Sequence, residues 1–322
     1  TSLVNSLKDP SSGIGTDDVN VSDDRTLTVK LHTPYSPLLG NLTKPLFEYG
    51  PYEVQKRTQK DILFTSRRDF IFGEPLISKI RYKIYPSKDA LTRALRQGEV
   101  LAGSDVITEL KGYTPYDLIL QRQTVLLFNL DRDPWKQGDI RTIIMNKQPF
   151  TSPQKMILTT PYDTLFLDKA QSLKETYKPL GLDIEIRSVD DLTMRENVVG
   201  KRDFDVLLYG IDTGRDPDPF PYWHSSQIGG TGTNLSGYKN KEVDSLLEQA
   251  LLLTNREERQ KKYDAVAKII SEQVPVIYLD TVHISYFASN KVHGVKIGYG
   301  VTEGDRYNNV WEWYILTKRA AK

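Results

Sequence analysis

The 322-residue chain carries 43 Lys and Arg against 42 Asp and Glu, and its net charge of +1 gives no electrostatic reason to expect nucleic acid as a partner. The length suggests about two domains, and 39% hydrophobic with 26% charged residues are typical of a globular protein. The lack of Cys excludes a Cys nucleophile, Cys-ligated metal centres and disulfides. No run approaches the ~20 apolar residues of a membrane span. Because the chain starts at Thr1 without Met, we expect a processed or cut polypeptide.

The first part of the chain predicts short strands with one helix. Alternating polar and apolar residues predict a strand over 25–31, and further strands are expected over 52–64, 77–85 and 125–128. Residues 88–97 predict a short helix ended by Gly98, with one apolar face made by Ala90, Leu91, Ala94 and Leu95. This part is therefore expected to be α+β.

A different pattern follows over residues 155–210. A strand over 155–160, an amphipathic helix over 165–180 and an alternating strand over 182–187 predict a βαβ unit in a mainly parallel sheet. A third strand, over 206–210, has the continuous apolar run of a strand covered on both faces.

The remaining chain predicts two helices and a β-rich end. The helices are expected over 241–253 and 257–272, and Asn255 with Glu258 three residues later is a plausible cap for the second. Residues 274–287 are apolar and β-rich, and short strand-like pieces follow over 295–316.

No motif for catalysis is present. The chain has no nucleophile elbow, Walker loop, dinucleotide fingerprint or zinc-protease motif. Its four histidines (His32, His224, His283 and His293) are scattered, and the adjacency of His224 and Ser226 does not make a triad. We therefore expect no catalytic residue, no metal site and no cofactor, and a protein that is not an enzyme.

The segment after the buried strand, residues 209–223, combines carboxylates, glycines and aromatic rings. It leaves the C-terminal end of the strand, where ligands bind in open α/β sheets. Carboxylates can capture an ammonium group, and aromatic rings supply apolar contact area. The alternative is an acidic surface loop, held by prolines, whose aromatics pack on the sheet.

Several motifs, in order, resemble those of the family 5 extracellular solute-binding proteins of ABC importers, the oligopeptide- and dipeptide-binding type. The pieces are KDP at 8–10, DDRTLTVKL at 23–31, PYSPLL at 34–39, GPYEV at 50–54, ALRQGEV at 94–100, FN at 128–129, IR at 140–141, DPDPF at 216–220, NLSGYKN at 234–240, DSLL at 244–247 and EQVP at 272–275. Family members are considerably longer, so the resemblance implies that the first part of lobe I, a small extra domain before Thr1 and some internal segments are missing.

The resemblance implies an α/β, two-lobed periplasmic-binding-protein-like fold (type II, cluster C) with mixed sheets and a ligand cleft between the lobes. Lobe I would comprise residues 1–127 and 279–322, and lobe III residues 128–278. In peptide-binding members a carboxylate after the central strand pairs with the ligand's ammonium. Asp212 matches that position, and Asp216 is the alternative because the loop carries one extra residue.

Other residues are also implied at the ligand. Tyr209, Gly210 and Ile211 would offer backbone groups to an extended peptide, as in strand addition. Tyr278 resembles the aromatic residue at the second crossover, and Phe128 lies at the first. Trp223 is expected to be partly solvent-accessible and to carry most of any ligand-induced fluorescence change.

The implied function is that of an extracytoplasmic receptor that captures short peptides and delivers them to an ABC-type permease. It would act as a monomer in the periplasm or at the outer face of the cell membrane, lipid-anchored in the full-length protein. Two alternatives remain open. The same fold could bind a non-peptide, such as a metal chelate, sugar or opine, or the chain could be an interaction module without a transport role.

Overall fold

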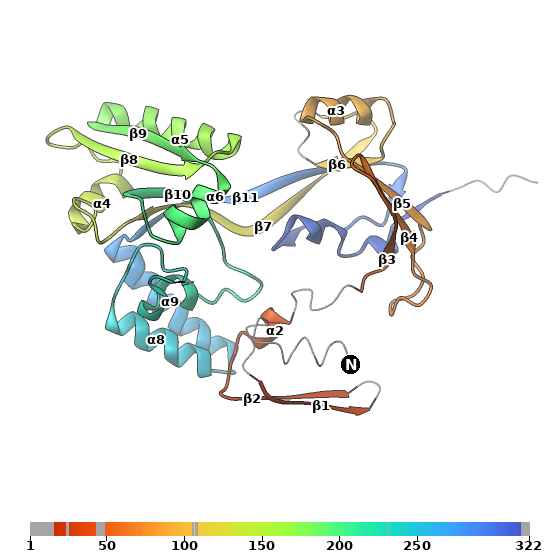
Figure 1. The fold of residues 1–322 in the computed structure, drawn as a ribbon, viewed down its shortest axis with the longest axis horizontal. Helices are drawn as coiled ribbons and strands as arrows, with labels where there is room; N and C mark the ends of the chain where they lie inside the picture. The colour runs from red at the N-terminus through yellow and green to blue at the C-terminus, as the bar shows by residue number, and fades with distance from the viewer. Residues whose placement is uncertain are drawn as a thin grey trace, which may run out of the picture. The chain divides into compact units, whose positions relative to one another are not determined.

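The computed structural model describes residues 16–23, 26–42, 49–104, 106, 109–230 and 232–316. The motif at 8–10 and Arg25, the first residue of an expected strand, lie outside these ranges. The chain divides into two compact units (Figure 1): unit 1 contains residues 1–46 and 122–280, and unit 2 contains residues 47–121 and 281–322. Strands β7 (Tyr113–Phe128) and β11 (Val276–Ser289) each pass from one unit into the other along the chain.

Unit 1 contains the predicted βαβ unit. Strand β8 (Gln154–Pro161), helix α5 (Thr164–Tyr177) and strand β9 (Leu182–Val189) follow one another, and the two strands pair in parallel throughout. Strand β10 (Val206–Asp212) pairs in parallel with β8 at Val206 and Leu207, and antiparallel with β7 over its full length. The strand order β7-β10-β8-β9 makes this a mixed sheet, as expected.

Strand β10 lies between two apolar clusters because its side chains alternate between the two faces of the sheet. Val206 and Leu208 belong to the cluster that includes Ala170 and Tyr177 of α5. Leu207 and Ile211 belong to the other cluster, which includes residues of helices α8 (Lys241–Leu252) and α9 (Arg256–Gln273). This burial on both faces explains the continuous apolar run in the sequence.

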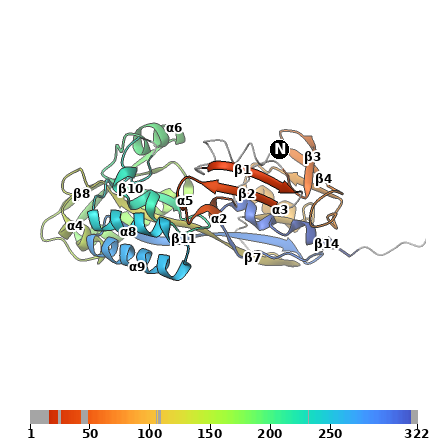
Figure 2. The same cartoon turned by 90° about the horizontal axis from the view of Figure 1, so that it is seen from below.

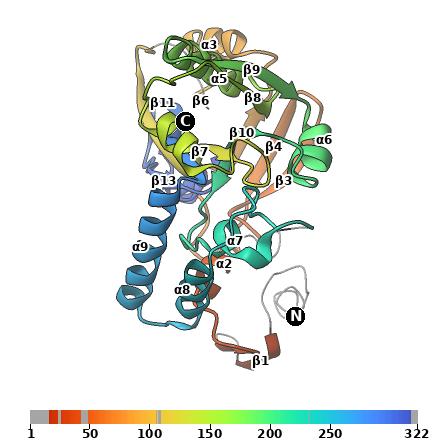
Figure 3. The same ribbon diagram turned by 90° about the vertical axis from the view of Figure 1, so that its left-hand side faces the viewer.

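Helices α8 and α9 lie side by side (Figure 3). The Asn255 side chain accepts hydrogen bonds from the N–H groups of Glu257 and Glu258, at 2.9 and 3.1 Å, which confirms the predicted cap. The remaining short elements of unit 1 are α4 (Gly138–Met145), η2 (Lys178–Leu180), α6 (Asp191–Thr193), the π-helical turn η3 (Met194–Val199), α7 (Phe220–Trp223) and η4 (Ser225–Gln227).

The N-terminal part of unit 1 is a hairpin followed by one helical turn (Figure 2). Strands β1 (Thr16–Asp23) and β2 (Thr26–Leu31) pair antiparallel, and α2 (Leu38–Asn41) follows. Ser36 attaches this part to the end of α8, since its N–H donates to the Leu251 carbonyl at 3.0 Å. The motifs assign these residues to lobe I, over 1–127 and 279–322, and that lobe division stays a prediction.

Unit 2 contains a three-stranded antiparallel sheet of β3 (Tyr52–Arg57), β4 (Asp61–Ser66) and β5 (Lys79–Lys83). The single strand expected over 52–64 is wrong, because the chain turns at residues 58–60. There the Thr58 hydroxyl accepts hydrogen bonds from the Lys60 and Asp61 N–H groups, at 3.2 and 3.0 Å. Neither strand has one face buried and the other exposed, so apolar periodicity gave no signal that would place the turn.

The other elements of unit 2 are α3 (Lys88–Arg96), β6 (Ala102–Ser104), β12 (Val292–His293), β13 (Tyr299–Gly300), η5 (Glu303–Tyr307), η6 (Val310–Glu312) and β14 (Tyr314–Ile315). Strand β6 pairs with the part of β11 at Tyr286–Ala288, and β13 pairs with β7 at Ile119 and Leu120. Within the described ranges, no helix is both long and apolar enough to cross a membrane.

Candidate functional site

Asp212 ends strand β10, but its carboxylate already has a partner. Arg122 lies opposite it on β7, and its Nε and Nη2 donate to the two Asp212 oxygens at 2.7 and 3.1 Å. Both side chains are about half exposed. A carboxylate has about four acceptor sites, and this two-bond contact uses one on each oxygen. Asp212 can therefore accept a further donor from the solvent side while it remains paired with Arg122.

Two tyrosines lie close to this ion pair. The hydroxyl of Tyr222 donates to the backbone carbonyl of Asp212. Burial and, to a smaller extent, the nearby negative charge of Asp212 raise the pKa of Tyr222 to about 12. Burial also raises the pKa of Tyr209, while the positive charge of Arg122 opposes that rise. Both phenols therefore stay neutral at physiological pH and can serve as hydrogen-bond donors next to the carboxylate.

The backbone of β10 has a free edge at this end. Its pairing with β8 is recorded only at Val206 and Leu207, whereas its pairing with β7 continues to Asp212. Within the described residues, the edge from Tyr209 to Asp212 that faces away from β7 has no strand partner. Alternate residues of an antiparallel strand direct their backbone groups to the partner strand, and the bond from the Asn129 N–H to the Asp205 carbonyl places Ile211 among the residues that bond β7. Gly210 instead directs its N–H and C=O toward the outer edge, where an extended chain could add to the sheet.

The expected exposure of Trp223 is wrong. Its side chain is only 4% exposed, and it packs in the core of unit 1 with its ring 6.0 Å from that of Tyr238, edge to face. The reason is that Phe220–Trp223 form a helical turn, α7, which places the indole against the sheet rather than outward. A Trp223→Phe substitution would therefore report on core packing and not only on a ligand.

Tyr278 on β11 remains available at the surface. The residue is 49% exposed, and the indole of Trp223 lies close to its hydroxyl. Burial raises the pKa of Tyr278 to about 12, although the neighbouring Trp223 opposes the rise. The sequence neighbours Tyr222 and Trp223 thus contact Asp212 and Tyr278 respectively, so one helical turn links both residues to a single region of unit 1.

Phe128, the residue expected at the first crossover, has no surface to offer a ligand. Its ring is fully buried in the core of unit 1, 6.0 Å from the ring of Trp135. Its position at the end of β7, opposite Val206 of β10, places it under the sheet rather than at the edge. We therefore remove the Phe128 side chain from the candidate site.

Asp216, the alternative partner for an ammonium group, forms a largely buried ion pair. Its Oδ2 accepts from Nη1 of Arg259 at 2.9 Å, and the guanidinium of Arg259 lies over the ring of Tyr263 at 5.8 Å. These contacts join the loop after β10 to helix α9. A pocket of about 330 Å³ adjoins the pair, lined in part by Arg215 and Arg256. Asp216 therefore has a structural partner already, and Asp212 is the more accessible carboxylate.

The neighbouring Asp218 should make the stability of this loop depend on pH. Burial raises the pKa of Asp218, and the charge of Asp216 adds to the rise, while the N–H of Phe220 donates to its Oδ1 and opposes it. A raised pKa means that the folded protein binds more protons than the unfolded chain between the two pKa values. The contribution of this group to stability therefore falls as pH rises through that interval.

We expect Asp218→Asn to raise the melting temperature at pH 7, because Asn keeps an acceptor oxygen for Phe220 and carries no buried charge. The gain should shrink as pH falls toward the ordinary Asp pKa of 3.8. Melting curves over this pH range measure it, with the exposed Asp183→Asn as the matched control. A lower melting temperature at pH 7 would show that the charge of Asp218 is needed for the fold.

The histidine near the serines caps a turn. Nδ1 of His224 accepts the N–H of Ser226 at 3.1 Å and lies 2.7 Å from its hydroxyl, and Nε2 lies 3.3 Å from Glu248 Oε1. The His224 side chain accepts the N–H of Ser226 at the first turn of η4, and this bond stabilises the start of η4. In the described part of the chain, no three His, Asp or Glu side chains gather closely enough to hold a metal ion.

Sequence reasoning missed Arg122 and Tyr222. Arg122 lies 90 residues before Asp212, and only the register of β7 with β10 brings them together. No local pattern carries that information. Tyr222 was part of the aromatic segment after β10, but its hydroxyl contact with Asp212 depends on the helical turn of α7, which the prolines around it did not predict.

Sequence comparison finds relatives over part of the chain, and no family model matches. Over 113 residues, 35% of this chain, it is 30% identical to the oligopeptide-binding protein AppA of Bacillus subtilis. Over 132 residues it is 26% identical to the peptide transport periplasmic protein SapA of Haemophilus influenzae. The matched segments cover only 21% and 23% of these relatives, about a fifth of their lengths.

Structure comparison covers nearly the whole chain. AppA from Bacillus subtilis, solved with a nonapeptide, matches 98% of this chain and 82% of its own, with a TM-score of 0.73 and 16% identity. NikZ from Campylobacter jejuni, solved with Ni(L-His), matches 97% and 83%, with a TM-score of 0.76 and 16% identity. The resemblance inferred from the motifs is confirmed: the chain has the fold of the two-lobed extracytoplasmic solute-binding proteins and is similar in sequence to peptide-binding members of that group.

Proposed function

We propose that the protein is a receptor that captures short peptides outside the cytoplasm and delivers them to an ABC-type permease. The names of the two relatives reported above support this, since one is an oligopeptide-binding protein and the other a peptide transport protein. The observation that carries the proposal is the position of Asp212 beside the free edge of β10. The edge offers backbone hydrogen bonds to an extended peptide, and the half-exposed carboxylate can accept its ammonium group.

Arg122 has a defined part in this proposal. A free carboxylate would lose its water shell when a peptide covers it, at a considerable cost in free energy. Arg122 already holds both oxygens of Asp212 in one orientation. Binding of the ammonium group therefore costs less side-chain entropy. The hydroxyls of Tyr209 and Tyr278 would donate to peptide carbonyls nearby.

The proposal is tested by calorimetry with two forms of one peptide. A native mass spectrum of the protein as purified from cells first identifies the retained ligand. That peptide and its N-acetylated form are then titrated into the emptied protein. We expect the free amine to bind more tightly by about 2–4 kcal/mol, the cost of leaving one member of a charge pair without its partner. Equal binding of the two forms would contradict ammonium capture by Asp212.

A non-peptide ligand is the second candidate, because a structural neighbour holds Ni(L-His). In this chain we expect no stoichiometric transition metal. Strong metal sites in proteins combine several Cys, His or carboxylate ligands, and the sequence has no Cys and four scattered His. Elemental analysis of the protein as purified measures this, with a chelator-treated sample as the blank. About one nickel or zinc per chain would instead favour a metal-chelate receptor.

The cellular setting is proposed with the function. We infer that the protein acts as a monomer in the periplasm or at the outer face of the membrane, and that a lipid anchors the full-length form. It performs no chemistry on its ligand. Binding by a two-lobed receptor works by population shift, in which a ligand that contacts both lobes favours the closed state. Light scattering on the 322-residue chain should give its monomer mass of 36.8 kDa, and a multiple of that mass would contradict the monomer.

A further inference from the structure

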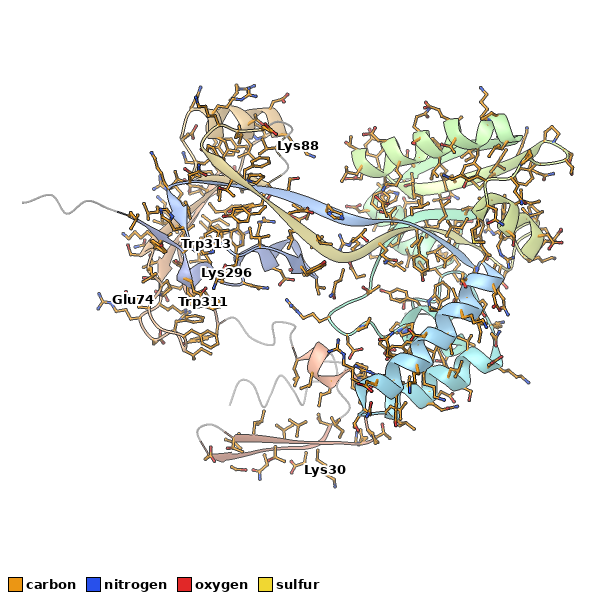
Figure 4. The ribbon with its side chains drawn as sticks, turned by 180° about the vertical axis from the view of Figure 1, so that it is seen from behind. Lys30, Glu74, Lys88, Lys296, Trp311 and Trp313 are labelled. Atoms are coloured by element: carbon orange, nitrogen blue, oxygen red, sulfur yellow. The ribbon has the colours of Figure 1, made fainter. Side chains whose placement is uncertain are left out.

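Unit 2 contains a cavity of about 830 Å³ that is separate from the residues around β10. Strand β5, helix α3, strand β6 and the C-terminal segment line it. Apolar walls come from residues such as Ile80, Leu91, Ala102, Val292 and Trp313. Figure 4 labels Lys88 on α3 and Trp313 on the C-terminal segment, which line the cavity from different elements. This volume is within the range of cavities that enclose small organic molecules.

The lining of this cavity is predominantly positive. Its cationic side chains are Lys79, Arg81, Lys83, Lys88 and Arg306, whereas Glu99 and Glu303 are its only carboxylates among the described residues. Glu99 is already paired with Lys83 at 2.7 Å. An apolar cavity with an excess of cations favours a ligand that carries both an apolar body and a negative charge.

Arg306 is the most deeply placed of these cations. Its side chain is 7% exposed, and its guanidinium lies over the rings of Tyr307 and Tyr286, at 4.9 and 5.7 Å. Nη1 donates to the Glu303 carbonyl at 2.9 Å, and Nη2 donates to the Tyr82 hydroxyl at 3.1 Å. The Nε atom is buried and has no acceptor among the described residues.

The charge of Arg306 is therefore only partly compensated. In the described part of the chain its one ion-pair partner is Glu303, at 3.5 Å, and that side chain is 64% exposed. Aromatic rings and neutral acceptors stabilise a buried cation less than an anion does. An unpaired donor at a buried guanidinium is costly, so an anion that enters the cavity would gain more here than at a surface arginine.

We propose that this cavity binds a small organic carboxylate, with its carboxyl group at Arg306 and its apolar body against Leu91, Val292 and Trp313. The guanidinium provides the charge-assisted hydrogen bonds, and Tyr82 adds a phenolic donor beside it. The lysines at the rim attract the anion and make its binding weaker at high salt. The alternative is that Arg306 only joins η5 to β5, through its bonds with Glu303 and Tyr82.

The test uses 3-phenylpropionate as the probe and its uncharged amide as the control ligand. Calorimetry and saturation-transfer NMR are performed on the full chain at low and high salt. We expect saturable binding of the acid, and binding of the amide that is weaker by about tenfold or more. Arg306→Gln should lower the affinity for the acid to the level measured for the amide. Arg93 is an exposed arginine of α3 outside the cavity, and Arg93→Gln should leave the affinity for the acid unchanged.

Arg306→Gln can also disturb folding, so a second variant fills the cavity instead. Leu101 is 37% exposed and lines the cavity, and Leu101→Trp should abolish probe binding without removing any charge. Equal affinity of the acid and the amide would overturn the proposal. So would the absence of saturable binding in the millimolar range, or full affinity in a folded Leu101→Trp or Arg306→Gln protein.

Discussion

Replacing Arg141 by Ala is expected to lower the free energy of unfolding by about 3–5 kcal/mol. This arginine of α4 is buried, and its guanidinium donates to three backbone carbonyls: those of Trp135 at 2.5 Å, Gln273 at 2.7 Å and Val274 at 2.8 Å. Two of these carbonyls are at the end of α9, where the helix dipole is negative. Without Arg141, three buried acceptors would lose their partner at once.

The free energy lost with the hydrogen bonds of Arg141 exceeds the free energy gained when its buried charge is removed. Burial lowers the pKa of Arg141, which shows that the site disfavours the charge itself. The unpaired carbonyls would nevertheless dominate, because a buried acceptor without a donor costs about 1–3 kcal/mol. The residue lies in the IR pair of the family resemblance, and its contacts give that pair a structural reason: it joins α4 to the connection between α9 and β11.

Urea unfolding followed by circular dichroism measures the effect. Because the chain has two compact units, the two can unfold separately, and the transition of unit 1 is the one that should move. Arg195→Ala is the matched control, since Arg195 is an exposed arginine of the same unit, and it should change the stability by no more than about 0.5 kcal/mol. A loss below about 1 kcal/mol for Arg141→Ala would show that water replaces the guanidinium at these carbonyls.

Replacing Asp212 by Ala is expected to weaken peptide binding by about 2–4 kcal/mol, because the ligand's ammonium would then meet Arg122 alone. The effect on stability should be small, about 0–1 kcal/mol, because the Arg122–Asp212 pair is half exposed. A large loss of binding with a small loss of stability separates a ligand contact from a structural ion pair.

The N-acetylated peptide completes this experiment as a thermodynamic cycle. In Asp212→Ala the free-amine peptide should lose affinity while the acetylated one keeps most of its own, since acetylation removes the charge that Asp212 would bind. Asp183→Ala, an exposed carboxylate of β9, serves as the control for net charge. If Asp212→Ala weakens both peptides equally, the carboxylate acts through Arg122 and the shape of the loop, not through the ammonium.

Local sequence patterns predicted much of unit 1, because apolar periodicity and helix capping depend on residues that are close in sequence. The βαβ unit follows from the change of apolar period between β8, α5 and β9, and the start of α9 follows from the capping chemistry of Asn255. The apolar run of β10 predicted its coverage on both faces. The motifs spread along the chain predicted the fold group, which the structure comparison confirms.

The composition of the candidate site depended on tertiary structure. Asp212 could be named from its place after a strand, but its pairing with Arg122 depends on the register of two strands 90 residues apart. The burial of Trp223 depends on a helical turn that packs against the sheet, and no local pattern distinguished a ring turned inward from one turned outward. The sequence by itself determined the strands and helices of the βαβ unit, the helices α8 and α9, and where a carboxylate would follow a strand. Only the packing of distant segments decided which charges meet and which rings are buried, because those outcomes depend on register and on contacts that no short window of sequence contains.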